Sequence, residues 1–420
     1  MKLLIKSVKV IQSSSEFHQQ KVDILVKDGV ISSIKSKIDE VADETLEIEN
    51  LHLSEGWFDS SVSFGEPGYE ERETLENGLL TAAKSGFTQI GLNSNINPIA
   101  DHASALNFLQ KENEKQAVRV YPIAALTKHS EGKDLAEVYD MHTAGAVSFY
   151  DYKKPVSNPN LLKIALQYVQ NFDRLVQSFP LDESIAHKGY VHENKQSTIL
   201  GLKGIPSFAE ELQISRDLHI LEYTGGKLHI PTISTKKAVE LIREAKKKGL
   251  DVSCSVAIHQ LVFNNDKLDT FNSHFKVMPP LRSKEDQEAL VKGVNDGTID
   301  LVTTDHMPMD IEHKKVEFEN ALFGTIGLES AFGALNALLG LEKAIDLLTR
   351  GKKRFHIPSS LIKEGEVANF SFFNPKGNYI FAPQHILSSS KNAMFLDHSL
   401  TGKALGIYAQ KNLVIHESDS

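Results

Sequence analysis

The alternation of short apolar strands with amphipathic helices constrains the fold of this chain more than any other feature. Eight strand-like segments alternate with helical stretches over about 300 residues. This pattern favours a (β/α)8 barrel, with an open doubly wound sheet as the alternative. No glycine-rich loop follows the first strand, which argues against a nucleotide-binding sheet. We expect the barrel strands at residues 56–59, 88–92, 118–124, 146–149, 174–176, 227–230, 252–256 and 301–304, and helices at 73–84, 103–112, 158–171, 207–222 and 236–248.

Both ends of the chain are rich in β-forming residues. Neither end is large enough to bury a good core alone. We therefore predict one small β-domain built from residues 1–54 and 366–420, with the barrel spanning residues 55–365.

Composition excludes several classes of function. A net charge of −9 and a pI near 6.0 do not indicate the basic surface that a nucleic-acid-binding protein needs. Cys254 is the only cysteine, so no intramolecular disulfide can form, and its apolar surroundings indicate a buried packing residue. No apolar run of about 18 residues and no signal-peptide pattern is present, so we expect a cytoplasmic protein without a membrane span.

The segment from Glu55 to Gly68 contains the first predicted barrel strand, and it carries serines where a strand could present metal ligands. Ser61 and Ser63 lie two residues apart, so both side chains point to one face. A neutral serine hydroxyl is a poor ligand for zinc, which prefers imidazole, thiolate or carboxylate.

Several longer motifs carry a family resemblance over essentially the whole chain. The chain resembles dihydroorotases of the type that associates with aspartate carbamoyltransferase. The resemblance implies an amidohydrolase-type (β/α)8 barrel in which a zinc-bound hydroxide opens or forms a cyclic amide and an aspartate shuttles the proton. The motifs are Glu66-Pro-Gly68, Gly86-Phe-Thr88, Gly201-Leu-Lys-Gly-Ile-Pro206, Lys276-Val-Met-Pro-Pro-Leu-Arg282, Thr304-Asp-His306, Phe323-Gly324, Gly327-Leu-Glu329 and Ser390-Lys-Asn392.

The positions that hold the metal in this family are largely replaced. The resemblance puts its four metal-binding histidines at Ser61, Ser63, Phe179 and Thr232. The metal-site carboxylates that remain are Asp151, at the bridging position, and Asp305, at the proton-shuttle position. Two carboxylates alone cannot hold a catalytic zinc that needs about three protein ligands and an open position.

The substrate-binding positions are also changed. By the same resemblance, Gly65 replaces the arginine that pairs with the substrate carboxylate, so a bidentate clamp is lost. Met278 replaces an asparagine, Met309 replaces a histidine, and the substrate-facing asparagine remains as Asn95. With Phe179, the two methionines make the pocket apolar, so an anionic substrate would lack compensation for its desolvation.

The leading hypothesis is a catalytically degenerate dihydroorotase homologue that needs no zinc, forms a homo-oligomer and serves as an assembly partner of aspartate carbamoyltransferase. One alternative is an active cyclic amidohydrolase that uses Asp151 and Asp305 at a non-standard site. Another alternative is a module that binds a small molecule in the apolar pocket.

Other polar residues have ordinary structural interpretations. We expect His229, His259 and His306 to be packing residues and Asp59 to cap the first loop. His187 and His192, five residues apart, have weak metal spacing. The basic runs at 236–237, 246–248 and 351–354 are typical of solvated faces, with a phosphate site as the lesser alternative.

Overall fold

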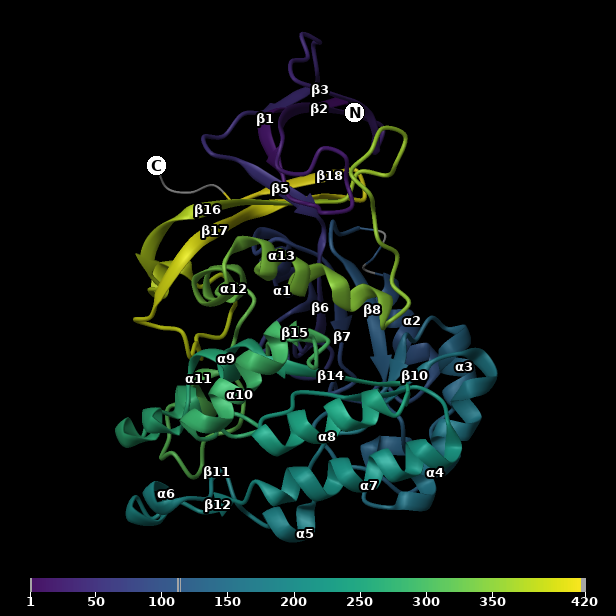
Figure 1. The fold of residues 1–420 in the computed structure, drawn as a ribbon, viewed down its shortest axis with the longest axis vertical. Helices are drawn as coiled ribbons and strands as arrows, with labels where there is room; N and C mark the ends of the chain where they lie inside the picture. The colour runs from purple at the N-terminus through teal and green to yellow at the C-terminus, as the bar shows by residue number, and fades with distance from the viewer. Residues whose placement is uncertain (1, 112, 114, 417–420) are drawn as a thin grey trace.

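The computed structural model describes residues 2–111, 113 and 115–416 and contains a parallel eight-stranded barrel sheet. Its strands follow the order β15-β14-β13-β10-β9-β8-β7-β6, so neighbours in the sheet are neighbours along the chain (Figure 1). This order confirms the barrel and excludes a doubly wound sheet, whose order reverses at a switch point. The strands are β6 (Trp57–Val62), β7 (Phe87–Leu92), β8 (Arg119–Ala124), β9 (Ser148–Phe149), β10 (Leu175–Gln177), β13 (Leu228–Ile230), β14 (Val252–Ala257) and β15 (Leu301–Thr303).

Side chains close the seam between the first and last barrel strands. The carboxylate of Asp59 on β6 accepts hydrogen bonds from the Thr303 hydroxyl at 2.5 Å and from the Thr304 amide at 2.9 Å. Beyond these, the Ser63 amide donates to the His306 carbonyl at 2.8 Å. Asp59 also accepts from the Ser61 amide at 3.0 Å, so it orders the first loop, as predicted, and joins β6 to β15 as well.

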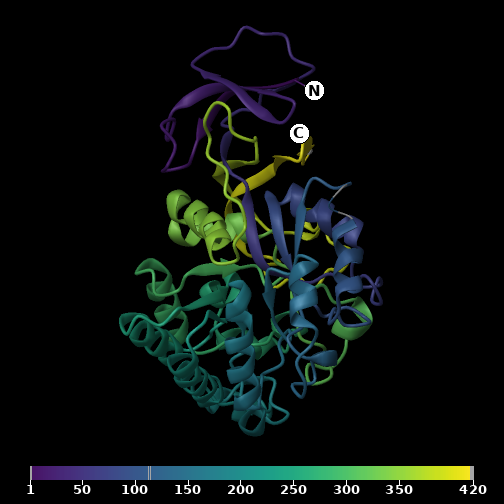
Figure 2. The same ribbon diagram turned by 90° about the vertical axis from the view of Figure 1, so that its right-hand side faces the viewer.

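Helices surround the barrel strands, as the view along the side of the molecule shows (Figure 2). Side-chain caps begin two of these helices: Thr74 accepts from the Asn77 amide, and Ser283 forms a capping box with Asp286. The helices are α1 (Leu75–Lys84), α2 (Ala103–Lys111), α3 (Val138–Thr143), α4 (Pro159–Val169), α5 (Glu183–Ala186), α6 (Lys195–Ile199), α7 (Phe208–Thr224), α8 (Lys236–Lys247), α9 (Ile258–Val262), α10 (Lys284–Asn295), α11 (Ile311–Lys314), α12 (Ala331–Leu339) and α13 (Leu341–Thr349).

A second sheet is assembled from both ends of the chain and forms a separate β-domain (Figure 1). Its order is β18-β17-β16-β5-β1-β2-β3, and β4 pairs with β1. Gly56 alone separates β5 from β6, so the sheet runs directly into the barrel; the boundaries at 54/55 and 365/366 remain a prediction. The strands are β1 (Lys2–Val10), β2 (Lys21–Lys27), β3 (Val30–Lys35), β4 (Glu44–Leu46), β5 (His52–Glu55), β16 (Phe370–Ile380), β17 (Ser399–Ala409) and β18 (Asn412–Ile415).

Within the described ranges, no helix is both long and apolar enough to cross a membrane.

Candidate functional site

The serines at the end of β6 are held by asparagines from the loop after β7. The side-chain amide of Asn93 donates to the Ser61 hydroxyl at 3.1 Å and to the Ser63 hydroxyl at 3.4 Å. The Ser63 hydroxyl in turn donates to Oδ1 of Asn95 at 2.9 Å. The structure therefore brings Asn95 next to Ser63, and hydrogen bonds with neutral asparagine side chains hold both serine hydroxyls.

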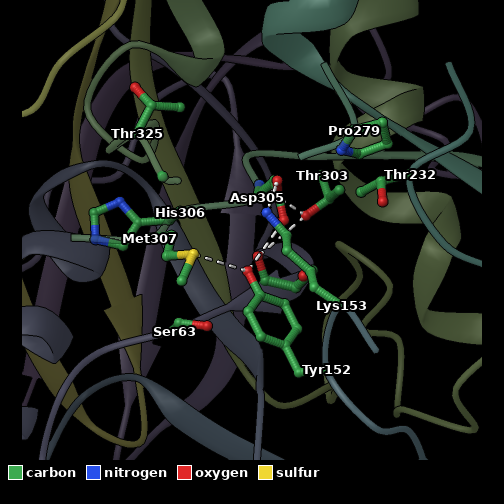
Figure 3. A network of polar contacts seen from close by, with 12 residues as sticks. Ser63, Tyr152, Lys153, Thr232, Pro279, Thr303, Asp305, His306, Met307 and Thr325 are labelled. Atoms are coloured by element: carbon green, nitrogen blue, oxygen red, sulfur yellow. Dashed lines mark hydrogen bonds and ion pairs between the residues drawn. The ribbon is translucent and has the colours of Figure 1, made fainter. Parts of the chain in front are cut away.

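A buried ion pair occupies the centre of the site (Figure 3). Nζ of Lys153 lies 2.7 Å from Oδ2 of Asp305, and the two side chains are only 10% and 2% exposed. The hydroxyl of Tyr152 donates to the other carboxylate oxygen at 3.3 Å. The retained Asp305 is thus already neutralised by a cation that the chain itself supplies.

Backbone conformation brings this lysine into the site. Lys153 has a φ of 54°, in the left-handed region, and its amide donates to the Tyr150 hydroxyl at 3.0 Å. Asp305 has a φ of 50°, and its amide donates to the Thr303 hydroxyl at 3.1 Å. Sequence reasoning missed Lys153; its position just after a barrel strand was the available signal, because such strand ends carry the chemistry of these barrels.

Burial dominates the electrostatics of the pair. Burial raises the pKa of Asp305, while the charge of Lys153 and hydrogen bonds from Lys153 and Tyr152 oppose the rise. Burial also raises the pKa of Tyr152 well above its ordinary value, and the nearby charge of Asp305 adds to the rise. The phenol therefore stays protonated and acts as a hydrogen-bond donor to Asp305.

Asp151, the second retained carboxylate, has structural partners of its own. Its Oδ1 accepts from the amides of Leu126 and Thr127, each at 2.9 Å, and its Oδ2 accepts from the Thr127 hydroxyl at 2.5 Å. These bonds fix the loop after β8. Asp151 and Asp305 thus share none of these partners, and the structure does not join them into a carboxylate pair.

Apolar side chains fill much of the space at this end of the barrel. Phe179 and Tyr152 belong to a buried cluster against which Met278 and Met307 pack. Met309 lies apart from this cluster: it is buried and its amide donates to Oδ1 of Asn392 at 3.1 Å. The methionine that contacts the site is Met307, whose sulfur lies 3.7 Å from the Tyr152 hydroxyl.

Gly65 lies where a side chain cannot be added without moving the backbone. A Cβ atom built at this position would lie 1.9 Å from the Tyr69 carbonyl oxygen. The backbone around residue 65 therefore has room only for glycine, because an arginine or any other larger residue would have to displace the loop that carries Tyr69.

The three histidines near strand ends are buried, and none belongs to a group of three possible metal-binding side chains among the described residues. His229 shares hydrogen bonds with the hydroxyls of Ser253 at 2.8 Å and Ser255 at 3.1 Å. Nδ1 of His306 accepts from the Gly327 amide at 3.2 Å. Burial lowers the pKa of His259 and of His306 to about 3, so both rings are neutral at pH 7.

The residues present do not fit the zinc that the family resemblance implies. Within residues 2–111, 113 and 115–416, no three His, Cys, Asp or Glu side chains are grouped so that they could hold a metal ion. Thr232, at one former ligand position, has a buried hydroxyl without a hydrogen-bond partner among the described residues, but a hydroxyl is a weak zinc ligand. The nearest cationic group to Asp305 is the Lys153 ammonium, which would repel a dication.

Comparison with known proteins agrees with this fold. L-hydantoinase (dihydropyrimidinase) from Arthrobacter aurescens superposes with a TM-score of 0.84 at 22% identity, covering 99% of this chain and 96% of that one. Dihydropyrimidinase from Brevibacillus agri NCHU1002 gives a TM-score of 0.81 at 18% identity, with 99% and 95% covered. At these identities the likeness establishes the fold alone.

Sequence comparison identifies the family. A family model described as dihydro-orotase-like matches residues 52–238. The dihydroorotase of Syntrophus aciditrophicus (strain SB) is 36% identical over 426 residues, covering 99% of this chain and 100% of the relative. The dihydroorotase of Pelotomaculum thermopropionicum is 36% identical over 409 residues, covering 96% of each. The barrel, the retained motifs and these full-length matches together show that the chain belongs to the dihydroorotase family.

Proposed function

We propose that this chain is a non-catalytic member of the dihydroorotase family that works without a metal ion. The single observation that carries the proposal is the buried Lys153–Asp305 pair. A proton shuttle must exchange protons with substrate, but Asp305 already accepts from an ammonium and a phenol. Together with the four replaced histidine positions, this pairing leaves the site without a group that can activate water.

Metal content and turnover measured on the same sample test this proposal. We expect elemental analysis to find no stoichiometric zinc in the purified chain and an assay of dihydroorotate hydrolysis to detect no turnover. The dihydroorotase of Syntrophus aciditrophicus, purified in parallel, is the positive control for both measurements. Stoichiometric zinc together with turnover would refute the proposal.

We further propose that the retained barrel serves as an assembly partner of aspartate carbamoyltransferase and self-associates. The outer surface of the barrel supports association, since large apolar side chains on the packed helices α4 and α7 are exposed to solvent. We call this set the α4/α7 surface: Ile164 (42% exposed), Tyr168 (43%), Phe208 (49%), Leu212 (52%) and Tyr223 (79%). Phe208, Leu212 and Tyr223 recur at helical spacing and lie along one face of α7. Exposed apolar patches of this kind mark protein–protein contacts.

Size-exclusion chromatography with light scattering tests the assembly. The chain mixed with the aspartate carbamoyltransferase of its own organism should elute as a larger complex than either protein alone. Leu212→Glu and Tyr223→Glu should abolish that complex, whereas Ile199→Glu, an exposed apolar position on α6 (72% exposed), should not. Elution of the two proteins as separate species would contradict the partnership.

A further inference from the structure

A cavity with a basic lining lies at the junction of the barrel and the β-domain, away from the site described above. Its volume is about 410 Å³, within the range of small-molecule sites. The barrel contributes Lys84 and Ser85 at the end of α1 and Glu329 before α12, and the β-domain contributes residues of β16 and β17. A ligand here would therefore contact both parts of the fold.

Among the residues that the structure describes, four basic side chains and one acidic side chain line this cavity. The basic ones are Lys84, His385, Lys403 and His416. Neither lysine forms an ion pair with any residue that the structure describes. The charges of Lys403 and His416, after burial, lower the pKa of His385, which shows that the cations repel one another inside the cavity. An anion placed between them would relieve that repulsion.

The wall also presents hydrogen-bond donors. Nδ1 of His385 accepts from the Ala382 amide at 2.9 Å, so the remaining ring proton is on Nε2. The hydroxyl of Ser85, a residue that is only 4% exposed, has no hydrogen-bond partner among the described residues. These donors would complete the coordination of an anion that the lysines attract.

Glu329 is the one acidic residue of the lining within the described ranges, and burial raises its pKa. The charge of Glu73 adds to the rise, although hydrogen bonds from Ser388 oppose it. Its Oε1 accepts from the Ser388 hydroxyl at 2.6 Å, while its Oε2 has no hydrogen-bond partner among the described residues. A protonated carboxyl at this place would donate to an anion and would not repel it.

We propose that this cavity binds a small organic anion that carries a carboxylate or a phosphate group. Lys84 and Lys403 supply the charge from the two domains, and His385 and Ser85 donate hydrogen bonds. The aromatic ring of Tyr379, which Lys403 covers at 4.8 Å from the ring centroid, forms an apolar wall for the carbon skeleton. The site is independent of hydrolysis, so it can exist whether or not the barrel is catalytic.

Isothermal titration calorimetry on the full chain, in a phosphate-free buffer of low ionic strength, tests the proposal. The probes are inorganic phosphate and succinate, which distinguish a phosphate from a carboxylate ligand. We expect one equivalent of at least one probe to bind. Lys84→Met and Lys403→Met should each weaken binding about tenfold or more, corresponding to about 1.4 kcal/mol. Lys376→Met, which removes an exposed lysine from β16 outside the cavity, should leave binding unchanged.

Two outcomes would overturn the proposal. The first is no binding of either probe up to about 10 mM, where even a millimolar site would be occupied. The second is unchanged affinity in both lysine variants, with His385→Gln as the further variant if either lysine variant fails to fold by circular dichroism.

Discussion

Replacing Lys153 by methionine tests the role of the buried ion pair most directly. Methionine keeps the unbranched apolar stem of lysine and removes the ammonium 2.7 Å from the Asp305 carboxylate. Because both side chains are almost fully buried, solvent cannot replace the lost partner. Breaking one side of a buried pair costs about 3–5 kcal/mol, and we expect Lys153→Met to lose about 3 kcal/mol of unfolding free energy at pH 7.

The size of the loss should depend on pH with a definite sign. Without Lys153, the folded-state pKa of Asp305 lies further above its unfolded value, so the folded variant holds Asp305 protonated over a wider pH range. The folded variant then binds more protons than its unfolded state, and its stability rises relative to the native chain as pH falls. Between pH 7 and pH 5 the difference in unfolding free energy between the native chain and Lys153→Met should decrease by up to about 2.7 kcal/mol, at about 1.36 kcal/mol per pH unit.

Urea denaturation followed by circular dichroism measures these differences, with Asp305→Asn completing a double-mutant cycle. Asparagine tolerates the φ of 50° at this position and cannot ionise. The double variant Lys153→Met/Asp305→Asn should be no less stable than Lys153→Met alone, because neither charge remains to be buried. A loss below about 1 kcal/mol for Lys153→Met at pH 7, or additive losses in the cycle, would refute the assignment of a tightly coupled buried pair.

Three further predictions concern the seam, the histidines and the metal. Asp59→Ala should lower the free energy of unfolding in urea by about 3 kcal/mol or more, because it leaves the buried amides of Thr304 and Ser61 without their acceptor and weakens the bonding of the Thr303 hydroxyl. Ser60→Ala should cost little, because the buried Ser60 hydroxyl has no hydrogen-bond partner among the described residues. The folded-state pKa of His306 lies at about 3, below its unfolded value, so the unfolded chain binds more protons and the free energy of unfolding decreases as pH falls from about 6.5 towards 3. His306→Asn should reduce the slope of unfolding free energy against pH in this window by about 1.4 kcal/mol per pH unit. Histidines can be restored at the four family positions, Ser61, Ser63, Phe179 and Thr232. The restored protein should bind zinc in calorimetry only when Lys153 is also replaced. Equal zinc affinity with and without Lys153 would contradict the electrostatic argument.

The barrel could be predicted because strand–helix alternation is local and repeats along the chain. The segment at 146–149 shows the limit: only Ser148–Phe149 pairs as a strand, and the Ala146 amide donates instead to the Met141 carbonyl of α3. The replaced ligand positions could also be found, because each motif fixes its own register. For Lys153 the position after a strand was the one available signal, because its side chain reaches Asp305 through a left-handed backbone and the two residues are about 150 apart in sequence. The partners of Asp151 were hidden for the same reason, as they lie on a loop after a different strand.

The β-domain built from both termini has a consequence for synthesis on the ribosome. Strand β5 pairs with Phe370–Phe373 of β16, so the edge that β5 presents stays without its partner until most of the chain has been made. At about 5–20 residues per second, the interval between the two strands lasts roughly 15–60 s. An open strand edge is a template for unwanted pairing during that time. The nascent chain therefore depends on its last strands to protect its first ones, and chaperones that bind early β-segments would act in this interval.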